Sequence, residues 1–173
     1  MKKFIAFFSL LLFSTLIFYG CQPQEVRTYT DAELQKVQGL AEKLWNSGDI
    51  AIVDTLYSAD CVYHSADILD AKGLEETKKF VQWVYTAYPD FAIVLDEPLK
   101  LTDRVVITFK ATGTNNGPLS ETMPATGKKM SFTGVSILKM ENGKIKEEWS
   151  YYNQLAIYKQ LGYVLMLPEE KTD

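Results

Sequence analysis

The chain has 173 residues, of which 47% are hydrophobic and 23% are charged, a composition typical of one globular domain with a substantial core. The formal net charge is −4, and loss of Lys2 and Lys3 with a cleaved leader would leave 16 of the 18 basic residues against 22 acidic ones, a charge of −6. An acidic surface disfavours partners that require a basic patch. We therefore expect neither a nucleic-acid partner nor direct binding to an anionic membrane surface.

Residues 1–20 are predicted to be a secretory signal peptide. Lys2 and Lys3 precede the uncharged apolar run FIAFFSLLLFSTLIF, and the polar residues 21–29 follow it as a tether. The run is shorter than the ~20 residues that cross a bilayer comfortably. The leader therefore predicts export from the cytoplasm.

Gly20-Cys21 at the end of this leader resembles a bacterial lipobox. The resemblance implies cleavage before Cys21, a lipid on its thiol and a lipid-anchored protein of the bacterial cell envelope. In the alternative interpretation, the protein is secreted or periplasmic and Cys21 is incidental. Cys61 is the only other cysteine. No disulfide framework is expected, and Cys61 in an apolar stretch is predicted to be a buried, inert thiol.

The part of the chain that follows the tether is predicted to be mainly helical. Thr30 and Glu33 form a capping box before a helix with one apolar stripe, which ends at 46–48; the stripe comprises Leu34, Val37, Leu40, Ala41, Leu44 and Trp45. A short helical segment over 49–56 and a brief strand over 58–65 come next. A further amphipathic helix begins at Gly73 and ends before Pro89.

Strand periodicity replaces helical periodicity after Pro89. Four runs of period two, 91–101, 104–114, 129–140 and 145–153, predict a curved antiparallel sheet, with Asn142-Gly143 as a tight hairpin turn. The Gly- and Pro-containing stretch 115–128 reads as an exposed loop. Helices followed by consecutive strands define an α+β domain over 30–173, with the helices packed on one face of the sheet.

The last strand is the first candidate for a ligand-binding wall. Strict alternation places Ile145, Glu147, Trp149, Tyr151 and Asn153 on one face. Two aromatic rings followed by one amide have the composition of a pocket wall. In the alternative interpretation, the two rings are core residues and Asn153 caps the helical segment that follows, up to Gly162.

Several motifs together resemble the SnoaL-like polyketide cyclase family: YPDF at 88–91, GT at 113–114 with Gly117, P-x-T-G-K at 124–128, Phe132, N-G-K-I at 142–145, E-E-W at 147–149 and Q-L-G at 160–162. The resemblance covers nearly all of the chain after the tether. It implies the nuclear-transport-factor-two-like, or cystatin-like, fold, a cone-shaped sheet around a helix-backed pocket. It also implies that the pocket wall includes Tyr63 and His64 beside Trp149, Tyr151 and Asn153.

One position departs from the family pattern. The ring-closing enzymes of the family carry an aspartate as general acid and base four residues after the tryptophan, and this chain has Asn153 there. An amide cannot take up or release a proton near neutral pH. His64, the only histidine, is the candidate replacement. The more common role of such a residue is that of a partly exposed polar side chain.

Two acidic residues receive structural interpretations. Asp90 is predicted to satisfy backbone amides of a turn, and Glu147 could reach the pocket or lie in solvent at a strand end.

No metal site is predicted, because Cys61 and His64 of the C-x-x-H pair face opposite sides of a strand and no second cluster completes a tetrahedral site. No cofactor is expected.

Two classes of function remain, both with a small hydrophobic ligand. The favoured interpretation is an envelope lipoprotein that binds a small hydrophobic or ring-containing molecule without the family's acid and base chemistry. The alternative is a small enzyme of the ester cyclase or isomerase kind that uses His64 and Asn153 in place of the missing aspartate. A homodimer is also expected, through the open sheet face; its residues include Val106, Thr108, Val135 and Ile137.

Overall fold

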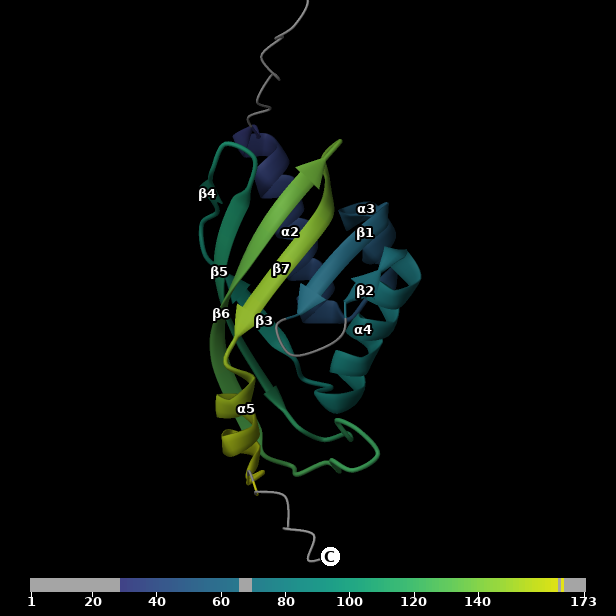
Figure 1. Ribbon diagram of the computed structural model, residues 1–173, viewed down its shortest axis with the longest axis vertical. Coiled ribbons are helices and arrows are strands. Elements are labelled where there is room, and N and C mark those ends of the chain that lie inside the picture. The colour runs from purple at the N-terminus through teal and green to yellow at the C-terminus, as the bar shows by residue number, and fades with distance from the viewer. Residues whose placement is uncertain (1–28, 66–69, 165, 167–173) are drawn as a thin grey trace, which may run out of the picture.

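The computed structural model describes residues 29–65, 70–164 and 166 (Figure 1). The predicted signal peptide, Cys21 and the tether up to residue 28 lie outside the described residues. Within the part of the chain that is described, no helix is both long and apolar enough to cross a bilayer.

The first helix, α2, forms as the capping signal predicted. It spans Asp31–Ser47, and Thr30 and Glu33 each accept a hydrogen bond from the backbone N–H of the other. Gly48 ends the helix with φ of 67°, a left-handed conformation that glycine adopts at little cost. The 3-10 turn η2 (Ile50–Ile52) and the short helix α3 (Val53–Leu56) then lead into the sheet.

The second long helix, α4 (Gly73–Ala87), ends before Pro89 as predicted. It buries one stripe and exposes its charged side to solvent; the buried residues are Thr77, Val81, Val84 and Ala87. A two-residue strand, β2 (Ala71–Lys72), precedes α4 and was not predicted.

In the described part of the chain, seven strands form one mixed sheet. The main strands are β1 (Tyr57–Ser65), β3 (Ala92–Leu95), β5 (Val105–Thr114), β6 (Lys129–Glu141) and β7 (Lys144–Tyr152), with β2 and β4 (Leu99–Lys100) as short additions. The strand order is β2-β1-β7-β6-β5-β3, and β4 also pairs with β5. All pairs are antiparallel except β1 with β7, which run parallel. The prediction of an antiparallel sheet is confirmed for the other pairs, and the run 91–101 forms two strands instead of one.

The hairpin between β6 and β7 turns at Asn142-Gly143, as predicted. Both residues have positive φ, 52° and 73°. Two consecutive positive φ angles are the signature of a turn whose twist matches that of the flanking strands.

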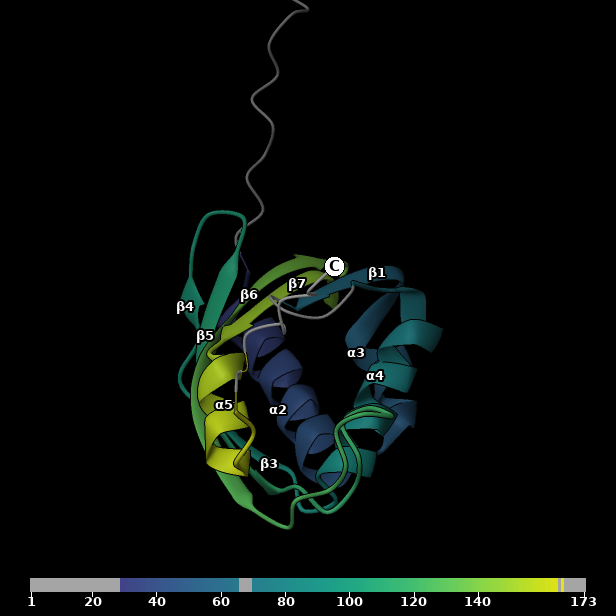
Figure 2. The same cartoon turned by 60° about the horizontal axis from the view of Figure 1, so that its bottom comes forward.

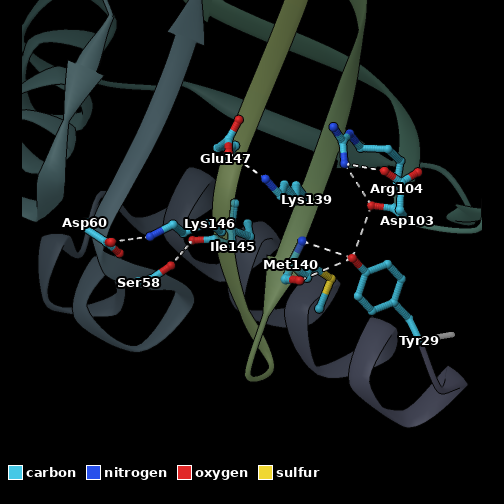
Figure 3. Close-up of polar contacts among 10 residues, drawn as sticks. All are labelled: Tyr29, Ser58, Asp60, Asp103, Arg104, Lys139, Met140, Ile145, Lys146 and Glu147. Carbon is cyan, nitrogen blue, oxygen red and sulfur yellow. Dashed lines mark hydrogen bonds and ion pairs between the residues drawn. The ribbon is translucent and has the colours of Figure 1, made fainter. Parts of the chain in front are cut away.

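A one-residue bulge interrupts β7 shortly after this turn (Figure 3). Met140 pairs with Ile145 and Lys139 pairs with Glu147, so Lys146 is an extra residue without a partner in β6. Its ammonium group forms an ion pair with Asp60, while Glu147 forms an ion pair with Lys139 at 2.9 Å. Because side chains alternate with period two, one extra residue exchanges the two faces of the strand beyond it.

The helices lie inside the curve of the sheet (Figure 2). The inward residues of β5 and β6 pack against α2 and α4; they include Val105, Ile107, Phe109, Leu138 and Met140. The short helix α5 (Gln154–Leu161) covers the end of the sheet at which β6 begins and β7 ends, and its residues Ile157 and Leu161 are buried there. The core therefore fills the concave side of a curved sheet, as the resemblance implied.

Tyr29, assigned from the sequence to the tether, belongs to the folded domain (Figure 3). Its ring is buried, and its hydroxyl lies 3.2 Å from the backbone N and O of Met140 and 3.3 Å from the backbone O of Asp103. The folded domain therefore includes Tyr29.

The stretch 115–128 is not simply an exposed loop. Asn115 is fully buried, donates to the Gly117 carbonyl at 2.7 Å and accepts from the Thr126 amide at 2.9 Å. Trp83 of α4 donates its indole N–H to the Leu119 carbonyl at 3.0 Å. These hydrogen bonds hold the loop in a defined conformation and attach it to α4.

Candidate functional site

A cavity of about 70 Å³ lies between the inner face of the sheet and helices α2, α4 and α5. Most of its wall is aromatic; these residues are Trp45, Tyr63, Phe80, Trp83, Tyr88, Phe91, Phe109, Phe132 and Tyr152. The wall combines segments from both halves of the chain, because the sheet curves around the helices. An apolar concave site with few polar groups is the usual form of a small-molecule site.

The rings of the wall pack against one another. The Tyr63 and Phe80 centroids are 4.9 Å apart, and the Phe132 and Tyr152 centroids are 5.0 Å apart. Trp45 meets Phe80 edge-on at 6.1 Å. Offset and edge-on contacts at these distances are favourable, so the wall is held in shape before any ligand arrives.

Among the lining residues that the structure describes, four polar ones interrupt this wall: Ser136, Glu148, Ser150 and Gln154. Glu148 is the ionisable carboxyl among the described lining residues, and only 6% of its surface is exposed. Its Oε2 accepts a hydrogen bond of 2.6 Å from the Tyr57 hydroxyl, and its Oε1 accepts one of 2.8 Å from the Ser136 hydroxyl. Both oxygens of the buried carboxyl are thus positioned by neutral donors.

Burial raises the pKa of Glu148 above its ordinary value of 4.5, and the hydrogen bonds from Tyr57 and Ser136 oppose that rise without cancelling it. Burial also raises the pKa of Tyr57 and of Tyr63 well above 10, with the nearby Glu148 charge as the second cause. Both phenols therefore remain neutral hydroxyl groups at physiological pH.

The bulge at Lys146 decides which residues of β7 reach this cavity. Beyond it, Glu148, Ser150 and Tyr152 face inward and line the cavity, whereas Trp149 and Tyr151 face outward. The face predicted from strict alternation is therefore wrong after Ile145. Glu147 also faces outward, so it does not reach the pocket.

The residues of the predicted pocket wall separate into two groups. Tyr63 lines the cavity as the resemblance implied. His64 and Trp149 lie on the outer face, with their rings stacked at 5.0 Å and 12°. His64 Nδ1 is 3.0 Å from a carboxylate oxygen of Asp70, and the Arg104 guanidinium lies 5.2 Å from the Trp149 ring centroid. The imidazole proposed as a replacement acid or base thus faces away from the cavity.

The last two predicted wall residues are also outside the cavity. Tyr151 is 47% exposed on the outer face. Asn153 is the N-cap of α5, and its side-chain oxygen accepts a hydrogen bond of 2.9 Å from the Ala156 amide. The capping interpretation of Asn153 is confirmed, and the amide is occupied in a structural role.

The predicted structural roles of Asp90 and Cys61 can be compared with the contacts that these two residues make. Asp90 lies in the turn before β3 and accepts hydrogen bonds of 2.6 Å from the backbone N–H and the hydroxyl of Thr114, so its carboxylate binds the end of β5 and not the amides of its own turn. These bonds lower its pKa. Cys61 is buried as predicted, 3.6 Å from the Thr77 hydroxyl oxygen. Among the described residues, no group of three or more His, Cys, Asp or Glu side chains is arranged to hold a metal ion.

Sequence reasoning missed Glu148 together with its two hydroxyl donors. Glu148 stands within the E-E-W motif, but strict alternation assigned it to the outer face. Tyr57 and Ser136 come from β1 and β6 and approach Glu148 only through the pairing of both strands with β7. The sequence of β7 contains no local pattern from which the bulge could be predicted.

The fold and the cavity define the class of protein: a nuclear-transport-factor-two-like α+β domain, with a curved sheet and helices that enclose a mostly aromatic cavity. The sequence model of the SnoaL-like polyketide cyclases matches residues 35–161. The chain belongs to this family, and the resemblance noted from its motifs is confirmed. No curated protein matches the chain.

Solved structures share this fold. TsrD from Streptomyces laurentii aligns with a TM-score of 0.69 and 21% identity over 78% of this chain and 98% of its own. A provisional SnoaL-like polyketide cyclase from Jannaschia sp. CCS1 aligns with a TM-score of 0.69 and 17% identity over 82% and 97%. AclR from Streptomyces galilaeus, described provisionally as a hydroxylase, aligns with a TM-score of 0.66 and 24% identity over 81% and 91%. At these identities the likeness establishes the fold alone.

Proposed function

We propose that this chain is a bacterial envelope lipoprotein whose cavity binds a small apolar molecule containing one or two rings. The observation that carries the proposal is the wall of mutually packed aromatic rings interrupted by four polar side chains. Apolar area holds such a ligand, and the few polar groups orient it.

The size of the cavity limits the ligand. A cavity needs roughly 10–15 Å³ to hold one water molecule, so the cavity of about 70 Å³ accommodates several groups of that size. That space suits a compact ring system better than a long acyl chain. Packed rings around it leave little freedom for the wall to expand.

Indane, an apolar two-ring hydrocarbon, tests the binding. Trp45 and Trp83 line the cavity, so their fluorescence should change on binding once the outer-face Trp149 is replaced in a Trp149→Phe background. Ser150→Phe places a ring in the cavity and should abolish the change. Ser131→Phe adds the same ring at an exposed position of β6 and serves as the matched control. Absence of any indane-dependent change in the background protein would contradict the proposal.

The envelope location rests on the leader. A charged start, an apolar run and Gly-Cys occur in the order that lipoprotein processing requires. We expect the full-length protein to enter the detergent phase on Triton X-114 partitioning and the Cys21→Ser variant to remain in the aqueous phase. Identical processing and partitioning of the two proteins would favour the secreted or periplasmic alternative.

The enzyme that uses His64 and Asn153 receives less support than the binding protein. The His64 ring stacks on Trp149 on the outer face, and Asn153 caps α5. For these two groups to act on one molecule in the cavity, β1 and the start of α5 would both have to rearrange.

We also propose that a second copy of the chain covers the outer face of the sheet. The strand register places Val106, Ile137 and Trp149 in one row across β5, β6 and β7, and Thr108, Val135 and Tyr151 in the next. These six residues form the outer-face patch. Tyr151 is 47% exposed and the four other apolar residues are half-buried, so a second copy would cover the apolar atoms that this face still presents to solvent.

Analytical ultracentrifugation at micromolar concentration should give a dimer for residues 29–173 and a monomer for Ile137→Lys. Lys110→Ala on β5, outside the patch, serves as the control. A wild-type protein that sediments only as a monomer would rule out the dimer.

A further inference from the structure

Glu148 occupies an unusual position for a charged residue. Its carboxyl lies between the main cavity and a smaller adjoining hollow of about 30 Å³, and it lines both. The smaller hollow is otherwise mostly apolar, with walls that include Ile107 and Leu138. The carboxyl thus forms a polar point between two apolar spaces.

No cation compensates this carboxyl among the described lining residues of either cavity, which include no lysine, arginine or histidine. The titratable groups beside it are the phenols of Tyr57 and Tyr63 from β1, and burial raises the pKa of both well above 10. The Tyr152 phenol from β7 lines the same cavity. The Ser136 hydroxyl from β6 completes its surroundings. An ionised carboxylate in such a site loses its hydration and gains only hydroxyl hydrogen bonds in return.

A buried polar group normally has at least one hydrogen-bond partner, and a carboxyl with a purely structural role need not border free space. Glu148 instead uses one bond on each oxygen, to Tyr57 and Ser136, and borders the cavity. Each carboxylate oxygen has two acceptor positions, so one on each remains for a bound molecule.

We propose that Glu148 is the proton-transfer residue of this cavity and acts on a ring-containing ketone or ester bound beside it. The inference rests on the proposed function, because it requires that such a molecule enters the cavity. It places the acid and base on β7 inside the pocket, five positions before the amide that replaces the family's aspartate.

The proton transfer is balanced without a cofactor. The Glu148 carboxylate removes a hydrogen as a proton from the carbon beside the carbonyl group, and the electron pair of that C–H bond forms the C=C bond of the enolate. The carbonyl oxygen receives the negative charge. The protonated carboxyl then returns the proton to the same carbon or to a conjugated one, so nothing is oxidised or reduced.

The neighbours of Glu148 stabilise both the carboxylate that removes the proton and the protonated carboxyl that returns it. The Tyr57 hydroxyl, at 2.6 Å, stabilises the carboxylate before it takes the proton. The apolar wall favours the neutral acid afterwards, since burial disfavours the charged form. Burial thus raises the pKa of Glu148 in the direction of neutral pH, which favours a group that both takes up and returns a proton.

The experiment follows exchange of the α-hydrogens of 1-indanone for deuterium by proton NMR in D₂O at neutral pD. Wild type, Glu148→Gln and Glu147→Gln are compared, and binding of 1-indanone is measured in parallel by tryptophan fluorescence in the Trp149→Phe background. Glu147→Gln is the matched control, because the same change is made one residue away on the outer face. Thermal unfolding verifies that all variants are folded.

We expect wild type to accelerate exchange over buffer, Glu148→Gln to lose about 100-fold of that acceleration, and Glu147→Gln to stay within about twofold of wild type. Bound 1-indanone that exchanges at the buffer rate, or equally fast in Glu148→Gln, overturns the role of Glu148 and leaves the binding function standing. Failure of wild type to bind either indane or 1-indanone overturns the proposed function, and the inference with it.

Discussion

Glu147 and Glu148 are adjacent residues of one type, yet they lie in opposite environments. Glu147 faces outward and forms an ion pair with Lys139, whereas Glu148 is buried between two hydroxyl donors at the cavity wall. The same division separates Trp149 on the outer face from Ser150 on the inner one. Adjacent residues of a strand always face opposite sides, so one of the two glutamates had to lie inside, and the bulge at Lys146 decides that it is Glu148.

The largest effect is expected from changing the number of residues at the bulge. Inserting one alanine between Glu147 and Glu148 would turn Glu148 outward and Trp149 inward, and should cost more than about 4 kcal/mol in the free energy of unfolding or prevent folding. Deleting Lys146 removes the extra residue but leaves Glu148 on the inner face, so it should cost much less and preserve indane binding. Urea unfolding of both variants measures this difference.

Equal losses of stability in the insertion and the deletion would show that the bulge does not determine the two faces. Lys146→Ala provides the control, because it removes the ion pair with Asp60 without changing the number of residues.

The next effect concerns the hydroxyl that contacts Glu148. Tyr57→Phe leaves one oxygen of a buried carboxyl without its donor and should cost about 1–3 kcal/mol. Tyr151→Phe removes the same group from the exposed outer face and should stay within about 0.5 kcal/mol of wild type. Chemical denaturation at pH 7 compares the two. A Tyr57→Phe protein as stable as Tyr151→Phe would argue against the bond.

Glu148 should also make stability depend on pH. Its pKa is raised on folding, so the folded protein holds this proton more tightly than the unfolded chain does. The stability that this group contributes is fully present below its ordinary pKa of 4.5 and is lost as the pH rises from there through the raised value. Each unit of the shift corresponds to about 1.4 kcal/mol.

Glu148→Gln removes this titration, so its stability should fall less than that of wild type between pH 4.5 and the raised pKa. Glu147→Gln should keep the wild-type profile. Parallel profiles for wild type and Glu148→Gln, measured by urea unfolding over this range, would mean that the carboxyl titrates normally.

The smallest effect is expected at Asn153. Asn153→Ala removes the N-cap of α5 and should cost about 1 kcal/mol, while Asn153→Asp keeps a capping oxygen and should cost less. Neither variant should change indane affinity, because the side chain lies outside the cavity. An Asn153→Asp variant that gains rapid exchange of 1-indanone would return the acid and base role to this position.

Local interactions explain which predictions succeeded. The capping box at Thr30 and Glu33, the stop at Gly48 and the Asn142-Gly143 turn each involve groups a few residues apart, so their chemistry is readable along the chain. The alternation of β5 and β6 was also readable. It placed Val106 and Ile137 on the outer face, as the structure does.

The site could be predicted only in part. Tyr63 was expected at the cavity, but Trp149 and Tyr151 were assigned to the wrong face, because one residue accommodated at Lys146 reverses the alternation of β7. A bulge depends on pairing with another strand and has no fixed signature within its own strand.

The sequence by itself determined the α+β class, the order of helices and strands, the aromatic character of the domain and the family. These depend on periodicity, capping and turn chemistry, which act over a few residues. The tertiary structure alone decided that Glu148 lies inside and Glu147 outside, and that Tyr57 and Ser136 meet the buried carboxyl. Those outcomes depend on the register of β7 against β1 and β6, which is settled when the sheet closes around the helices.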